Sequence, residues 1–269
     1  MLEFFLDDES LINFVKGCKW SIQRTKEKID CFYSTRTLFP EYFNNRDPFN
    51  SQTQKVLKAG LFYPLPNKSR SDKSKICYVA FPALQDVTLA ECVKVFFMTL
   101  DVLLNEDENF AEDGLQIIAD YKNITLKMLG EFTPRVVKSY LLCLQAAYPA
   151  RFRGYIGINI PNALEKVLNV ILNSFINEKT RSKITLLGTI SPGKLHKTMD
   201  KSMLPEELGG LNGSLPVIKE ELKTKMESYK DWFLEDAKYC SNERLRINKL
   251  KYKDEEFGVD GSFRKLNVD

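Results

Sequence analysis

The sequence predicts an α/β protein with a mainly parallel β-sheet flanked by helices, preceded by a small all-α N-terminal domain. From residue 76 onward, strand-like and helix-like segments alternate, as they do in a parallel sheet joined by right-handed crossovers. The clearest unit spans 152–176, where an apolar, β-branched strand ends at Pro161 and is followed by apolar residues at helical spacing. Residues 1–60 fit a small helical unit.

The N-terminal unit contains two helix starts. Asp7 to Ser10 precede apolar residues at helical spacing, and Ser21 caps a second helix that exits between Pro40 and Pro48. We therefore place the first domain boundary at residue 60. The connector that follows consists of Pro64, Pro66 and the polar residues 67–74.

The sheet domain is predicted from the alternating segments that follow the connector. Strands are expected over 76–84, 114–121, 152–160 and 184–188. Helices are expected over 88–105, from Pro134 to before Pro149, and over 162–177. This order implies helices on both sides of the sheet. Residues 216–240 are expected to be helical, and 241–269 form a polar tail.

Composition narrows the class of protein. A chain of 269 residues can bury a large core. Its net charge of +3 is too small to indicate a nucleic-acid partner. The N-terminus lacks the basic and apolar regions of a secretory signal, and no run reaches the length of a membrane span. The six cysteines include no CxxC pair, which argues against structural zinc. We expect a reducing, cytoplasmic location.

Three motifs invite a catalytic or nucleotide-binding interpretation, and each is incomplete. The segment from Gly188 to Lys194 fits GxxxxGK, but Leu195 stands where a phosphate loop needs Ser or Thr. His196, the single histidine, lies in a polar, lysine-flanked segment typical of solvated surface. Gly154 and Gly157 lie within a predicted strand and lack the third glycine of a dinucleotide site. We therefore predict no catalytic residue, no metal site and no enzyme.

The unit 152–176 leaves two interpretations open. It is either an ordinary strand–helix unit with surface lysines, or an apolar helix that closes over a cavity. Basic residues flank it at Arg151 and Arg153 before the strand and at Lys179, Arg181 and Lys183 after the helix. Such charges suit a membrane surface or an anionic headgroup.

Four stretches in order resemble the CRAL-TRIO lipid-transfer family, in the branch of α-tocopherol transfer protein and cellular retinaldehyde-binding protein. The resemblance covers nearly the whole chain, although the chain begins later than is usual in this branch, so a preceding helical segment is expected to be absent. The stretches are DESLINFVKGCKWSIQRTKEKIDCFYSTRTLFPEYF (8–43), YPARFRGYIGINIP (148–161), NEKTRSKI (177–184) and LPEELGG (204–210).

The resemblance implies the CRAL-TRIO fold, with a sheet-floored apolar pocket under a mobile lid helix at 162–176. The helical N-terminal domain would be 1–60, the lipid-binding domain 61–215, and the C-terminal helix and polar tail 216–269. The residues it places at the pocket are Phe97, Leu115, Ile117, Ala119, Tyr140, Cys143, Leu144, Tyr155, Leu164, Val167, Leu168, Ile171 and Phe175. From the pattern alone, each is equally compatible with ordinary core.

The resemblance also implies a basic cluster that binds phosphoinositide headgroups. The matching positions come from three separate segments of the chain and would meet only in the folded protein. They are Lys19, Arg151, Arg153, Lys179 and Lys183.

These inferences together predict a non-enzymatic carrier of a hydrophobic small molecule such as a tocopherol, a retinoid or a carotenoid. It would exchange this ligand at phosphoinositide-containing membranes and act as a cytoplasmic, peripheral monomer with no cofactor besides the bound lipid. Two alternatives remain: a phosphoinositide-binding or exchange module of the same fold, and a scaffold whose pocket has collapsed.

Overall fold

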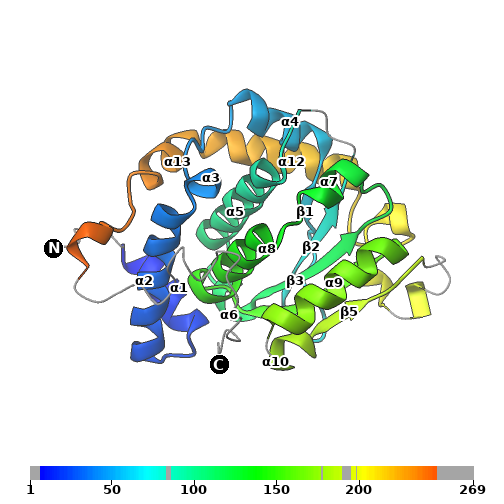
Figure 1. The fold of residues 1–269 in the computed structure, drawn as a ribbon, viewed down its shortest axis with the longest axis horizontal. Coiled ribbons are helices and arrows are strands. Elements are labelled where there is room, and N and C mark those ends of the chain that lie inside the picture. Colours follow the sequence, from blue (N-terminus) through cyan, green and yellow to red (C-terminus); the bar gives the residue numbers. More distant parts are fainter. Residues whose placement is uncertain (1–6, 83–85, 177, 190–194, 198, 247–269) are drawn as a thin grey trace.

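The structure is a computed structural model, and it places the first two helices of the N-terminal part at one end of the molecule and the sheet at the other (Figure 1). In Figure 1 the C-terminal helices run from the sheet back towards the N-terminal helices. The described residues are 7–82, 86–176, 178–189, 195–197 and 199–246, with the backbone alone at 134, 163, 167, 171 and 175.

The N-terminal part is built from helices that begin at the predicted caps. The Asp7 side chain accepts a hydrogen bond from the Ser10 amide at 2.7 Å, and the Ser21 side chain accepts one from the Arg24 amide. Between them, Lys19 and Trp20 take positive φ values of 55° and 63°. The helices are α1 (Asp8–Gly17), α2 (Ile22–Leu38), α3 (Pro40–Phe43) and α4 (Ser51–Ala59).

The described part of the sheet has five strands in the order in which they occur in the chain. They are β1 (Phe62–Pro64), β2 (Lys75–Ala80), β3 (Leu115–Asp120), β4 (Phe152–Ile158) and β5 (Ile184–Leu186). β2 to β5 are parallel, which confirms the predicted fold class, and β1 is antiparallel to β2. β1 was not predicted, and Pro64 was assigned to a connector. An edge strand tolerates proline because one side of its backbone needs no partner.

The crossover helices lie against one face of the sheet. Because each parallel strand is added on the same side of its predecessor, right-handed crossovers carry all these helices to the same face. The sequence had led us to expect helices on both faces. The helices are α5 (Leu89–Glu106), α6 (Phe110–Asp113), α7 (Leu126–Gly130), α8 (Pro134–Leu141), the π-helix η1 (Leu142–Ala147), α9 (Asn162–Phe175) and α10 (Glu178–Arg181).

The opposite face is covered by the chain that follows β5. Leu195, Met199 and Leu204 pack there against β2, β3 and β4 side chains. The helical segment predicted over 216–240 is divided at Tyr229, and the predicted three-domain division stays a prediction. The elements are η2 (Lys201–Met203), η3 (Glu206–Leu208), α12 (Leu215–Ser228), α13 (Lys230–Asp236) and η4 (Glu243–Leu245).

His196 departs from its predicted surface setting. It is half-buried, and its Nε2 lies 2.7 Å from the carbonyl oxygen of Leu208. The tight turn at Gly209, with φ of +71°, brings the two segments together. Much of the GxxxxGK motif, residues 190–194, lies outside the described part.

A buried ion network joins the N-terminal helices to the rest of the molecule. Arg46 is fully buried, and its guanidinium contacts the carboxylates of Asp101 on α5 and Asp236 on α13. Arg36 of α2 lies 3.3 Å from Asp236. Because buried charges need partners, this network fixes how α2, α5 and α13 meet.

Candidate functional site: an apolar cavity beside a basic basin

A cavity of about 170 Å³ lies between the sheet and the crossover helices, and we call it the apolar cavity. Ile117 and Ala119 of β3 and Tyr155 of β4 form part of its floor. Leu168, Leu172 and Ile176 close it from the side of α9. The end of the helix predicted over 162–176 therefore borders an apolar cavity, and its role as a lid stays a prediction.

The structure divides the predicted pocket residues into three groups. Those that line the apolar cavity are Ile117, Ala119, Tyr140, Leu144, Tyr155 and Leu168. Those that are buried outside its lining are Phe97, Leu115, Cys143 and Leu164. Those whose side chains lie outside the described part are Val167, Ile171 and Phe175.

Phe97 shows why such positions separate. Its ring stacks on Tyr148 with centroids 5.0 Å apart and lies 5.3 Å from the ring of Phe43. It therefore faces the N-terminal helices, while other residues of α5 face the cavity. A helix that is buried on most sides has apolar residues all round, whether they face a cavity or pack against another helix. The sequence alone therefore does not distinguish cavity-lining residues from core residues on α5.

Several lining residues were missed by the sequence reasoning. Leu89, Cys92, Val93 and Phe96 recur at helical spacing on α5, which is a signal that could have identified them. Phe81, Tyr121 and Phe132 come from loops or strand ends, where no periodic pattern marks them. Burial raises the pKa of the Cys92 thiol to about 12, so it remains protonated and unreactive at neutral pH.

Three tyrosines and Gln145 contribute polar groups to this largely apolar lining. The hydroxyls of Tyr121 and Tyr155 are hydrogen-bonded to each other, and Tyr140 lines the same cavity. Burial raises the pKa of Tyr121 to about 12 and that of Tyr140 further, so both phenols are neutral.

A second hollow of about 610 Å³ lies beside the apolar cavity, and we call it the basic basin. It brings together all five residues that the family resemblance assigned to a phosphoinositide cluster. They are Lys19, Arg151, Arg153, Lys179 and Lys183. Arg24 and Lys28 line it too and were not predicted, because their α2 segment is evenly charged and carries no distinguishing pattern.

Backbone carbonyls hold the two arginines in place. Arg151 Nη2 donates to the Lys16 carbonyl at 2.6 Å, and Arg153 Nε donates to the Asp113 carbonyl at 2.6 Å. The backbone of Arg151 passes close to Gly114, which takes φ of +85°. A Cβ at position 114 would lie 2.3 Å from the Arg151 carbonyl oxygen, so glycine is needed there. Among the described residues, neither Nη1 group has a hydrogen-bond acceptor, so both can donate to an anion.

The lysines of the basin are crowded cations. The pKa of Lys183 is lowered by partial burial first, and then by the positive charges of Lys179, Arg153 and Lys19. Lys28 donates to the carbonyls of Gln145 and Tyr148 at 2.8 and 2.9 Å, and burial lowers its pKa. An anion in the basin would relieve this repulsion.

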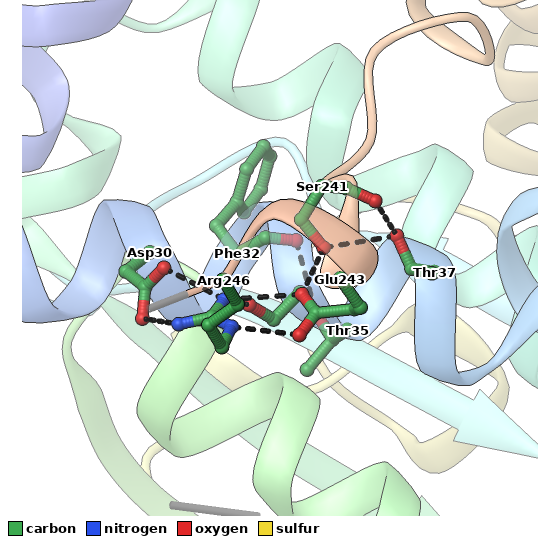
Figure 2. Close-up of polar contacts among 8 residues, drawn as sticks. Asp30, Phe32, Thr35, Thr37, Ser241, Glu243 and Arg246 are labelled. Carbon is green, nitrogen blue, oxygen red and sulfur yellow. Dashed lines mark hydrogen bonds and ion pairs between the residues drawn. The ribbon is translucent and has the colours of Figure 1, made fainter. Parts of the chain in front are cut away.

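The C-terminal segment neutralises one of the acidic residues of the basin. Asp30 of α2 lines the basin, and Arg246 binds both of its carboxylate oxygens at 2.9 Å (Figure 2). Arg246 also contacts Ser34 and Glu243, and Ser241 bonds to Thr37. The bidentate contact keeps the Asp30 charge from opposing an anion.

The cavity and the basin share a wall. Gln145 of η1 and Phe152 of β4 line both spaces. A π-helical turn inserts an extra residue into a helix and is frequent at functional sites, and η1 supplies this part of the partition. The site thus joins an apolar space to an anion-binding surface.

A comparison with known proteins assigns the family. Residues 67–210 match the family described as the CRAL/TRIO domain. The chain belongs to the CRAL/TRIO family. This confirms the family resemblance. Residues 2–53 match the family described as a Pinta-like UBA domain. The matched region includes α1 to α3 and the start of α4.

Individual relatives support the same CRAL/TRIO assignment. The human alpha-tocopherol transfer protein-like protein is 29% identical over 213 residues, which is 78% of this chain and 60% of that protein. Human Clavesin-2 is 26% identical over 208 residues, 76% of this chain and 62% of that protein. The chain therefore spans about 60% of the length of these relatives. The crystal structure of Sfh5 covers 85% of this chain and is itself covered to 82%, with a TM-score of 0.50 and 15% identity, which shows likeness of fold alone.

Proposed function

We propose that this CRAL/TRIO protein carries a hydrophobic small molecule, such as a tocopherol, a retinoid or a carotenoid, and exchanges it at phosphoinositide-containing membranes. The observation that carries the proposal is the apolar cavity beneath α9, directly beside the basic basin. The cavity would hold the cargo, and the basin would dock on the headgroup of a membrane lipid. The protein would act in the cytoplasm as a monomeric, non-enzymatic carrier, with no cofactor besides its lipid.

The apolar cavity is smaller than a long lipid, so its walls would have to move apart for such a lipid to bind, and we assign this movement to α9. A volume of about 170 Å³ suits a single ring, since a cavity of roughly 150 Å³ holds benzene. A ligand that buries about 400 Å² of apolar surface gains on the order of 10 kcal/mol, from which the cost of association is subtracted. Part of that gain would offset the cost of displacing the side chains of α9 that line the cavity.

Exposed apolar side chains beside the basin support contact with a membrane. The Trp20 side chain is 67% exposed and that of Ile22 is 72% exposed. Trp20 follows Lys19 directly in the sequence, and Ile22 comes two residues later. Lys19 lines the basin. Tryptophan favours the boundary between water and lipid, and cations favour anionic headgroups. Within the described residues, no helix is both long and apolar enough to cross a bilayer.

The first experiment is organic extraction of the protein purified from its native source, followed by mass spectrometry. A stoichiometric apolar molecule would support the carrier and name its cargo. An empty extract, together with no binding of tocopherol, retinoid or phospholipid, would contradict it and favour a scaffold.

The docking role is tested by transfer of a fluorescent lipid to vesicles with and without phosphoinositide. Lys179→Glu with Lys183→Glu should reduce the phosphoinositide-dependent rate by roughly tenfold, because both charges face the basin. The matched control is Lys55→Glu with Lys58→Glu on α4, where both lysines are exposed. Equal rates for the two double variants would contradict docking at the basin.

A second candidate function is a phosphoinositide-binding or exchange module, in which the phospholipid itself is the cargo. The wall shared by the cavity and the basin favours it, because one amphiphile could extend past Gln145 and Phe152. Phosphorus in the extracted lipid would distinguish this function from the first.

A further inference from the structure

We propose that the apolar cavity selects molecules that carry an uncharged oxygen group, such as an alcohol, aldehyde, ketone or ester. This group would accept hydrogen bonds from the tyrosine cluster, which we define as Tyr121, Tyr140 and Tyr155. The inference rests on the proposed carrier function and specifies the chemical class of its cargo.

Some O–H groups of the tyrosine cluster have no hydrogen-bond acceptor. A pair of hydroxyls joined by one hydrogen bond uses one O–H, so the Tyr121–Tyr155 pair retains the other. Among the described residues, the Tyr140 hydroxyl has no hydrogen-bond partner. Two O–H donors therefore face a cavity whose remaining walls are almost wholly apolar. A donor that faces an apolar space without an acceptor would gain a hydrogen bond from an oxygen atom of the ligand.

The hydroxyls are held in place by aromatic packing. The Tyr121 ring stacks on Phe81 with centroids 4.7 Å apart and planes 17° apart. Tyr140 packs against Phe96 with centroids 5.5 Å apart. Donors fixed in this way lose little freedom when a ligand binds, which favours selective recognition.

The surroundings of the cluster exclude other ligand classes. A pure hydrocarbon would leave both donors unsatisfied. A carboxylate or an ammonium group would lose its hydration in a lining that offers no opposite charge among the described residues, which costs far more than a hydrogen bond returns. A neutral oxygen at one end of an apolar molecule is the chemistry that remains.

The test uses acetophenone and ethylbenzene, two single-ring probes of similar shape of which only the first carries a carbonyl oxygen. Each suits the cavity volume of about 170 Å³. Dissociation constants would be measured by calorimetry for the wild type, Tyr140→Phe and the double variant Tyr121→Phe with Tyr155→Phe, because either hydroxyl of that pair alone would still offer one O–H donor. We expect each variant to lose about fivefold to tenfold in acetophenone affinity while ethylbenzene binds as well or better.

The matched control is Tyr63→Phe, which removes a buried hydroxyl on the other face of the sheet. That hydroxyl donates to the Gly60 carbonyl at 3.2 Å, away from the cavity. It should change the affinity of neither probe. Thermal unfolding of each variant checks that the fold is intact, and a Tyr→Phe exchange removes one oxygen without changing the packing of the ring.

Three results would overturn the proposal: equal losses for both probes, an acetophenone loss that also occurs in Tyr63→Phe, or no saturable binding of either probe to the wild type. Failure here differs from failure of the carrier function. A protein that yields a stoichiometric hydrocarbon on extraction would still be a carrier, but its tyrosine cluster would not select its cargo.

Discussion

Lys183 illustrates at the scale of one residue how the basic basin is prepared for an anion. Its amine lies among Lys179, Arg153 and Lys19, and its pKa is lowered by burial and by these charges. Because the charged form is disfavoured in the free protein, an anion that enters the basin should raise this pKa back towards the ordinary value of about 10.4.

We therefore predict that anion binding takes up protons at a pH between the lowered and the restored pKa of Lys183. Calorimetric titration with inositol trisphosphate in two buffers of different ionisation enthalpy would measure this uptake. Lys183→Arg keeps the charge but does not titrate in this range, so the uptake should decrease while binding persists. Proton release, or uptake that is unchanged in the variant, would contradict this assignment.

Helix α9 has two faces with different predicted roles. Leu168 faces the apolar cavity, whereas Val170 is 65% exposed. Leu168→Glu should weaken binding of the extracted lipid by at least roughly tenfold, because a carboxylate would enter an apolar site. Val170→Glu on the same helix is the matched control and should bind normally. Equal affinities of the two variants in a fluorescence displacement assay would show that α9 does not cover the cargo.

The turn between α1 and α2 offers a direct optical test of membrane contact. Lys19 and Trp20 both take the left-handed conformation, which is uncommon for residues other than glycine. The chain has two tryptophans, so Trp232→Phe leaves Trp20 as the reporter. Its emission should shift to shorter wavelength with phosphoinositide vesicles, because the indole leaves water. Bound vesicles with unchanged emission would place the turn outside the membrane contact.

The whole molecule depends on the buried ion network. Arg46 and Arg36 connect α5 and α13 to the N-terminal helices through Asp101 and Asp236. Asp101→Asn should lower the free energy of unfolding by about 3–5 kcal/mol, because it leaves buried arginine charge uncompensated. Glu235→Gln, which removes an exposed ion pair with Lys238, should cost less than about 1 kcal/mol. Urea unfolding measures both, and equal effects would contradict the role of the network.

Much of the fold could be predicted from local sequence patterns. The predicted helix starts at Asp7 and Ser21 begin helices in the structure, and each side chain caps its helix. The alternation from residue 76 predicted the parallel sheet, because each strand and helix carries its own periodicity. The edge strand β1 was missed since three residues ending in proline carry no periodic signal.

The site was only partly readable. The family resemblance named the five basic residues that meet in the basin. It did not predict Arg24 and Lys28, because only the fold brings these two residues to the other five. Six of the named pocket residues line the cavity, whereas Phe97 and Leu164 are buried outside its lining. An apolar residue has the same pattern whether it faces a neighbour or an empty space.

The sequence by itself determined the order of strands and helices, the parallel sheet and the family, because those follow from local periodicity, capping and motif. Only the tertiary structure decided that the crossover helices share one face, that Gln145 and Phe152 separate cavity from basin, and that Tyr121, Tyr140 and Tyr155 line one largely apolar cavity. These are relations between segments distant in the chain. They depend on packing in three dimensions, which no local pattern records.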